Sequence, residues 1–423
     1  MLRVHYAWVV AAITFLALLG SAGIRATSTV MILPLEHDFG WDRATVSLAL
    51  SVNLLLYGLC GPFAGALMTR FGLKRVMLAA LLTLSVATGV STFMQQVWQM
   101  VGLWGVLVGL GSGAMALVLG ATVATRWFVK RRGLVTGIFA ASAATGQLIF
   151  LPQQAALVET AGWRVAVLIV AVVALVVALL VALFMRDDPR DMGLQPYGGV
   201  EALPPAEAVT SNPFALAVDT LIQCAKVRDF WLLAGSFAIC GATTVGLISV
   251  HLIPASVEHG FDEVTAAGML AAMGAFDLVG TTVSGWLTDR IDPRKLLVWY
   301  YTFRGIALLF LPAAYSMGVP ALAAFVVLYG LDWVATVPPT VRLLGDRFSK
   351  ERVGPVFGWV FAAHQFGGSF AAYAAGAVHT ALGDYLVAFL TAGLLCLLAS
   401  GLILGLRGRV AAPPLVLQPA LPQ

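Results

Sequence analysis

The chain has 423 residues, of which 60% are hydrophobic and only 11% are charged, and its mean hydropathy is +0.91. A soluble domain carries about 25% charged residues, so this composition excludes an ordinary soluble enzyme or binding domain. The net charge of +4 does not indicate nucleic-acid binding, because the basic residues lie in short segments between apolar runs. The cysteines show neither metal-site spacing nor a disulfide framework: Cys60, Cys224, Cys240 and Cys396.

Apolar runs recur from one end of the chain to the other. A run of about 20 residues is long enough to cross a hydrocarbon core of about 30 Å as a helix. The first run could imitate a signal peptide, but the later runs favour an uncleaved first helix. We therefore predict an all-α membrane protein with twelve transmembrane helices, at residues 7–33, 44–68, 74–94, 98–125, 132–157, 163–186, 229–255, 264–288, 295–316, 320–345, 353–378 and 384–406.

Basic residues are distributed unevenly between the two sides of the predicted membrane. Of the 25 Lys and Arg residues, 20 lie at the termini or in alternate loops, and only Arg43 and Arg164 lie in the other loops. Cytoplasmic loops are enriched in Lys and Arg, so both termini are predicted to be cytoplasmic. We expect a multi-pass protein of the inner or plasma membrane, surrounded by the lipid bilayer.

The longest connection divides the chain into two halves. We predict an N-terminal six-helix bundle at 1–186, a cytoplasmic linker at 187–228, a C-terminal six-helix bundle at 229–406 and a Pro-rich tail at 407–423. The linker is rich in Pro, Gly, Glu and Ala, which is typical of a flexible segment. Its end, 212–223, is expected to form a short amphipathic helix on the membrane surface. The tail is expected to be disordered.

The two halves carry the same landmarks at one sequence offset. The loop 65–75 matches the loop 285–295 at an offset of 220, and the segment 126–131 matches 347–352 at an offset of 221. Two parallel repeats of six helices predict two bundles in a pseudo-twofold arrangement. In such an arrangement the substrate site lies at the membrane midplane between the bundles.

Charged residues also lie inside the predicted spans, where charge is costly and usually functional. Asp277 and Arg304 each lie roughly 14–18 Å along a helix from the turn that joins them, near the middle of the membrane. Asp332 is predicted at a similar depth, so we expect Arg304 to contact Asp277, Asp332 or both. Arg25 has no carboxylate partner in its own half. A guanidinium binds a carboxylate through two hydrogen bonds, so Arg25 is a candidate contact for an anion.

The loop 285–295, Gly-Trp-Leu-Thr-Asp-Arg-Ile-Asp-Pro-Arg-Lys, resembles the loop signature of the major facilitator superfamily of secondary transporters. This resemblance implies the major facilitator fold, with helices 1, 4, 7 and 10 around a central cavity. The first copy of the loop has Thr69 where the family usually has an acidic residue. The contact that this loop makes with neighbouring helices on the cytoplasmic side is therefore expected to be weaker. The resemblance implies a gating role on the cytoplasmic side for Gly65, Arg70, Arg75, Gly285, Asp289, Arg290 and Arg294.

Within the superfamily, the chain most resembles the monocarboxylate transporters and their bacterial oxalate/formate-antiporter-like relatives. That family carries an Asp in helix 8 with an Arg four residues later. Here Asp277 matches, but Thr281 stands at the Arg position. The resemblance therefore implies a carboxylate substrate. It also implies that the arginine that binds this carboxylate in the family has been lost here, or that Arg25 or Arg304 has taken its place. The resemblance rests on 126–137, on 276–285, and on Arg25 with the later Pro34-Leu-Glu36.

We predict a secondary active transporter that moves a small organic anion, in the first instance a monocarboxylate, by proton-coupled alternating access. We expect a monomer whose partners are the anion and a proton, with no cofactor, metal or nucleic acid. Some of the polar candidates could instead bridge helices, and the histidines could be packing residues. The candidate substrate-binding residues are Arg25, Arg304, Asn53, Tyr57, Gln147 and His364, and the candidate proton-coupling residues are Asp277, Asp332 and His251.

Other functions are less well supported by the sequence. A membrane-embedded enzyme needs a nucleophile with a base, or metal ligands, and the chain has no HExxH, GxSxG or CxxC motif. An organic-anion exchanger or a drug or metabolite exporter of the same superfamily remains the main alternative. The Gly-Pro-rich antiporter signature of such exporters is absent from 137–152, which disfavours an exporter without excluding anion exchange.

Overall fold

The computed structural model describes residues 5–199, 213–348 and 353–406, and these residues contain helices but no β-strand. The N-terminal half contains α1 (Tyr6–Val30), α2 (Ile32–Phe39), α3 (Arg43–Phe71), α4 (Leu73–Ser91), α5 (Val97–Met100), η1 (Val101–Leu107), α6 (Val108–Ala114), α7 (Leu117–Trp127), α8 (Arg132–Ala161) and α9 (Trp163–Phe184). The linker contains η2 (Pro189–Met192) and α10 (Pro213–Cys224). The C-terminal half contains α11 (Arg228–Gly241), η3 (Ala242–Ile248), α12 (Ser249–Glu258), α13 (Glu263–Thr288), α14 (Pro293–Met317), α15 (Val319–Asp332), α16 (Val337–Arg347), α17 (Val353–Leu382) and α18 (Leu386–Leu404).

The predicted spans correspond to helices in the described residues. Ten helical runs there are long and apolar enough to cross a membrane. The remaining two predicted spans are the 30-residue helices α8 and α17. The first predicted span, 7–33, extends too far, because α1 ends at Val30 and α2 begins as a separate helix after Met31. The predicted all-α membrane fold is confirmed.

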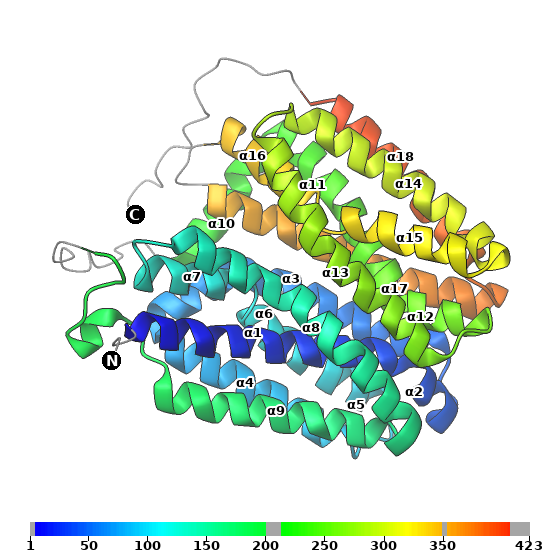
Figure 1. The fold of residues 1–423 in the computed structure, drawn as a ribbon, viewed down its shortest axis with the longest axis horizontal. Coiled ribbons are helices and arrows are strands. Elements are labelled where there is room, and N and C mark those ends of the chain that lie inside the picture. The colour runs from blue at the N-terminus through cyan, green and yellow to red at the C-terminus, as the bar shows by residue number, and fades with distance from the viewer. Residues whose placement is uncertain (1–4, 200–212, 349–352, 407–423) are drawn as a thin grey trace.

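The helices of each half lie together, and the two halves meet along four long helices. In Figure 1, α1, α4 and α9 lie in the lower part of the molecule, and α11, α14 and α18 lie in the upper part. Between them, α3 packs along α17 and α8 packs along α13. We call the end of the molecule with the loops 70–75 and 290–295 the basic end, and the opposite end, with α2, the far end.

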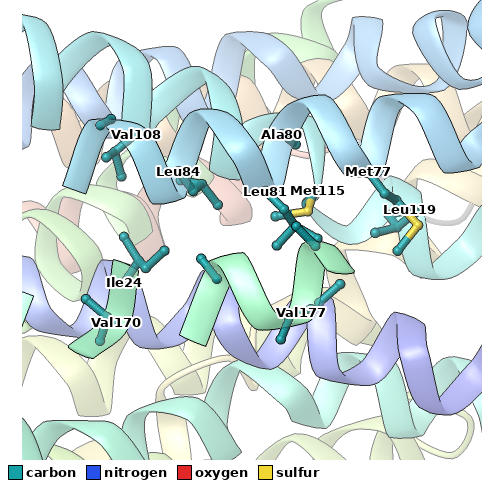
Figure 2. Close-up of a cluster of buried hydrophobic side chains, with 14 of the residues drawn as sticks. Ile24, Met77, Ala80, Leu81, Leu84, Val108, Met115, Leu119, Val170 and Val177 are labelled. Carbon is teal, nitrogen blue, oxygen red and sulfur yellow. The ribbon is translucent and has the colours of Figure 1, made fainter. Parts of the chain in front are cut away.

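Small residues and apolar contacts hold the N-terminal half together. A Cβ added to Gly109 would lie only 2.9 Å from the carbonyl oxygen of Asn53, so the fourth span can approach α3 only without a side chain there. Figure 2 shows the apolar cluster behind this contact, in which Ile24 of α1, Leu84 of α4, Met115 and Val177 of α9 lie close together. No charged side chain belongs to this described cluster.

Three of the predicted spans are not regular α-helices throughout. The seventh contains the π-helical turn η3, and the fourth contains η1 and a second break at Met115 and Ala116. The tenth is broken between Asp332 and Val337, where the next residues are prolines that cannot donate to a helical hydrogen bond. At the repeat offset of 221, Met115 corresponds to Thr336, so these two breaks occupy equivalent positions. Each break frees backbone groups that need partners inside a membrane.

The first part of the linker is hydrogen-bonded to the N-terminal half. Tyr197 donates its backbone N–H to the Trp127 carbonyl at 2.8 Å, and an oxygen of Asp187 accepts the Lys74 backbone N–H at 2.6 Å. Residues 187 and 197 of the predicted linker therefore contact the N-terminal bundle directly. The predicted amphipathic helix is α10, which packs on α3 and α17 through Phe214 against Phe63. The rest of the linker, 200–212, and the tail 407–423 lie outside the described residues.

Candidate functional site

Arg304 lies at the centre of a fully buried network in the C-terminal half. Its Nε donates to Asp332 Oδ2 at 2.7 Å, which confirms the predicted contact between these two residues. Its Nη1 donates to Cys240 Sγ at 2.7 Å. Its Nη2 donates to the backbone carbonyls of Asp332 and Trp333. Arg304 thus neutralises one buried carboxylate and satisfies two carbonyls freed where the tenth span is broken.

Asp277 satisfies the same break from the other side. Its Oδ1 accepts the backbone N–H of Val334 at 2.9 Å and the hydroxyl of Thr281 at 2.7 Å. Ser284, two turns further along α13, donates to the Ala335 carbonyl. Unpaired backbone groups in a membrane cost several kcal/mol each, so these contacts explain why polar residues are present at this depth. In the described structure, Asp277 makes no direct ion pair with Arg304.

The equivalent break in the N-terminal half has no charged brace. At the offset of 220 that relates the two signature loops, Arg304 corresponds to Leu84 and Asp277 corresponds to Tyr57. A pocket of about 90 Å³ lies at this break. Its lining combines aromatic, small and hydroxyl-bearing side chains with a single charged one, and includes Ser21, Arg25, Tyr57, Ser112, Met115 and Ala116.

Arg25 is the charged residue of this pocket, which we call the Arg25 pocket. Its guanidinium carbon lies 4.6 Å from the centre of the Tyr57 ring, within cation–π range. Its Nε is buried and has no hydrogen-bond partner among the described residues. No described carboxylate forms an ion pair with it. The pocket therefore presents an unneutralised cation with a free donor, which is the arrangement that an anion requires.

The other predicted binding residues are distributed differently. Asn53 Nδ2 donates to the Trp104 carbonyl at 2.7 Å, and this hydrogen bond links α3 to the π-helical turn η1. Tyr57 reaches toward the C-terminal half, where its ring lies 6.0 Å from that of Phe361 on α17. Phe361 in turn stacks on His364, whose Nδ1 is buried without a described partner. The side chain of Gln147 lies outside the described residues.

A second charged network joins the two halves at the far end, and we call it the Arg43 latch. Arg43 of α3 pairs with Glu36 of α2, and its Nη1 reaches Glu258 of α12 at 3.2 Å. Arg43 also donates to the hydroxyl of Tyr385. His379 of α17 meets the same oxygen of Glu258 at 2.8 Å. In the sequence, Arg43 is distinguished only as one of two basic residues in the loops on its side of the membrane.

His251 belongs to this latch rather than to the middle of the molecule. Its Nδ1 lies 3.1 Å from the Tyr385 hydroxyl and its Nε2 lies 2.8 Å from the Ala372 carbonyl. Both ring nitrogens are therefore engaged, and the side chain is fully buried. No spacing in the sequence predicted this network, because its members come from four helices and from the turn before α18.

The predicted gating residues make mainly local contacts at the basic end. Arg294 pairs with Asp292 at 2.7 Å, and this hydrogen bond lowers the pKa of Asp292. Arg290 lies over the Trp286 ring at 4.0 Å. Within the described residues, none of the candidates forms an ion pair between the halves: Gly65, Arg70, Arg75, Gly285, Asp289, Arg290 and Arg294. The side chain of Thr69 lies outside the description, and Asp187 supplies a carboxylate to this loop instead.

Comparisons with known proteins give one consistent result. The family model described as Major Facilitator Superfamily matches residues 11–281 and 232–420. The uncharacterized MFS-type transporter YcxA of Bacillus subtilis (strain 168) is 25% identical over 384 residues, which cover 87% of each chain. Monocarboxylate transporter 13 of Rattus norvegicus is 24% identical over 389 residues, which cover 91% of this chain and 85% of that one.

Solved structures resemble the whole chain as well. The crystal structure of a D-xylose-proton symporter superposes with a TM-score of 0.74 at 15% identity, covering 97% of this chain and 100% of that one. A bacterial homolog of the human lysosomal transporter Spinster, in an inward-facing and unoccupied conformation, has a TM-score of 0.74 at 16% identity and covers 95% and 98% of the two chains. At these identities, the structural likeness establishes the fold alone.

Proposed function

Because this chain belongs to the Major Facilitator Superfamily, we propose that it moves a small organic anion, in the first instance a monocarboxylate, together with a proton. The chain is a multi-pass membrane transporter and not an enzyme, and its resemblance to the monocarboxylate transporters is confirmed. The substrate and the proton are our proposal. They are argued below from the residues at the two helix breaks.

The observation that supports an anionic substrate is the unpaired guanidinium in the Arg25 pocket. A lone cation inside a membrane is costly, and every other described charge at this depth has a partner or a backbone group to satisfy. A bound carboxylate would neutralise Arg25 and accept from its free donors. Tyr57 lies against the guanidinium on one side and contacts Phe361 of α17. An anion bound here would therefore affect the contact between the two halves.

We assign proton coupling to Asp277, with Asp332 and His251 as further candidates. Asp277 Oδ1 is already occupied by two donors, so a proton would be taken up at Oδ2 without breaking them. With an anion on Arg25, a proton on Asp277 leaves the two sites without net charge. The loaded protein can then close with little charge buried, and alternating access follows as the two bundles rock about the midplane.

The Arg43 latch would limit this rocking at one side of the membrane. In the proposed orientation both termini are cytoplasmic, the bundles are 1–186 and 229–406, and the far end faces outward. Arg43 and Glu258 must separate before the Arg25 pocket can be reached from that side. We propose a monomer in the inner or plasma membrane, in which this latch breaks once in each transport cycle.

Transport in reconstituted vesicles tests the role of Arg25. Arg25→Ala should abolish uptake of small monocarboxylates while the protein stays folded, and Arg25→Lys should weaken binding because the planar fork is lost. Arg342→Ala is the matched control, because Arg342 is an exposed arginine of α16 paired with Asp346. Normal uptake by a folded Arg25→Ala protein would refute the proposal.

A second transport measurement tests the coupling residue. Asp277→Asn keeps an oxygen that can accept from Val334, so the helix break should remain intact. Uptake driven by a pH gradient should fall, while exchange of anion without a gradient should persist. If Asp277→Asn accumulates anion in response to a pH gradient as the unmodified protein does, Asp277 does not carry the proton.

A further inference from the structure

A second cavity lies on the N-terminal half and shares no lining residue with the Arg25 pocket. It is a groove of about 520 Å³ between the end of α3, the start of α4 and the helices η1 and α6. Its walls are apolar apart from Thr83 and from Arg75 at the basic end, and they include Leu67, Phe71, Ala79, Ala80, Leu107 and Leu110. Several of these side chains are exposed, which is expected of a face that lies against lipid.

From this groove we infer a specific binding site for one anionic phospholipid. The distance along α4 from Arg75 to Thr83 is about 12 Å, at 1.5 Å per residue. One leaflet of a hydrocarbon core of about 30 Å has nearly the same depth. An acyl chain can therefore lie in the groove while the phosphate of its headgroup stays level with Arg75.

The charge at the mouth of the groove favours an anionic headgroup. Arg75 lines the groove and is exposed, and the exposed Arg70 lies over the ring of Phe71, another lining residue. Lys74 lies between the two arginines in the sequence. No described carboxylate forms an ion pair with any of the three. The carboxylate of Asp187 is close, but its Oδ1 is bound to the backbone N–H of Lys74. Guanidinium and ammonium groups without acidic partners are suited to a phosphate.

The C-terminal half provides an internal comparison, because the repeat places different residues at the same positions. At the offset of 220, Ala79, Ala80 and Thr83 correspond to Trp299, Tyr300 and Phe303. Small side chains hollow the surface in one half, and aromatic side chains fill the matching positions in the other. The charge differs too, because Arg294, which corresponds to Lys74, is paired with Asp292. The groove and its basic mouth are therefore a feature of the N-terminal half and not of every membrane-facing surface of this fold.

The test uses the full-length protein purified in detergent, with phosphatidylglycerol or phosphatidylcholine added, and native mass spectrometry to count retained lipids. The unmodified protein should retain one phosphatidylglycerol in preference to phosphatidylcholine. Arg75→Gln should weaken that retention about 5-fold, the value of one basic residue at an anionic surface. Lys295→Gln, the repeat counterpart, should change it less than about 2-fold.

A second variant separates the groove from the charge. Ala79→Trp with Thr83→Phe copies the residues of the C-terminal half and leaves all three basic residues in place, and it should abolish selective retention. Equal retention of the two lipids, or selective retention after the groove is filled, overturns the proposal. The proposal is also overturned if the unmodified protein is a dimer and the variant with the filled groove is a monomer that retains lipid as before. The groove would then be an interface between two copies of the chain. If the filled variant does not fold, the Arg75→Gln and Lys295→Gln pair decides.

Discussion

The two helix breaks at the middle of this protein occupy equivalent positions in the repeat but are stabilised in opposite ways. In the C-terminal half, Arg304 and Asp277 satisfy backbone groups that the break frees, and Asp332 forms an ion pair with Arg304. In the N-terminal half, the break lies beside the apolar cluster of Leu84 and Met115, and a pocket with an unpaired arginine opens next to it. Side chains of the neighbouring helices α13 and α14 therefore satisfy one break, whereas an unpaired arginine lies beside the other.

This difference shows that a buried charge in a membrane protein need not mark the substrate-binding site. Arg304 and Asp277 are conspicuous in the sequence, yet all three nitrogens of Arg304 donate within the protein and Asp277 Oδ1 accepts two hydrogen bonds. Arg25 is less conspicuous, but it is the one whose Nε lacks a described partner. The comparison leads to four predictions, ordered from the largest expected effect on stability to the smallest.

Removing Arg304, which satisfies the break in the tenth span, should have the largest effect on stability. Arg304→Ala leaves Asp332 as an uncompensated buried charge and should lower the free energy of unfolding by about 3–5 kcal/mol. Thermal unfolding of the purified protein measures this loss. Adding Asp332→Asn should restore part of it, because the stranded charge is removed. A single variant as stable as the unmodified protein would show that the network does not brace the break.

The corresponding position of the N-terminal half should respond as a packing site. Leu84 is fully buried in the cluster of Figure 2, and Leu84→Ala should cost about 2–4 kcal/mol through the cavity it leaves. Leu84→Met keeps most of the volume and serves as the control, with a cost below about 1.5 kcal/mol. If Leu84→Met destabilises as much as Leu84→Ala, packing is not what this position contributes.

Asp277 should be replaceable by a neutral acceptor as far as stability is concerned. Asp277→Ala leaves the Val334 backbone N–H unpaired and should cost about 1–3 kcal/mol, whereas Asp277→Asn should cost less than about 1 kcal/mol. Thermal unfolding of the two variants side by side gives the comparison. Equal losses in the two variants would mean that the negative charge, and not the acceptor, stabilises the break.

The smallest effect is expected where each half caps the helix that follows its signature loop. Asp292 caps α14 from within the loop, while Gly72 at the equivalent position has no side chain and Asp187 supplies the carboxylate from the linker. Asp187→Ala and Asp292→Ala should each cost about 1 kcal/mol, as helix caps usually do. An unchanged melting temperature for Asp187→Ala would make its contact with Lys74 incidental.

Much of the fold follows from local properties of the sequence. The length of each apolar run is enough to predict a spanning helix, and the repeat of 65–75 at 285–295 predicts two related bundles. The similar depth of Arg304 and Asp332 also predicts their contact, since a lone charge in a membrane is costly. These features need only distances along single helices, and therefore the sequence determines them.

The candidate site depended on tertiary structure. The breaks in the fourth and tenth spans decide which backbone groups need partners, and only packing between helices shows that Asp277 serves Val334. The Arg43 latch joins residues as far apart in sequence as Arg43 and Tyr385. No periodicity or spacing encodes such a contact. By itself, the sequence determined which residues lie in the membrane and how deep they are. The packing of the two halves decided which of the described charges inside the spans have partners, and it left Arg25 without a described acidic partner.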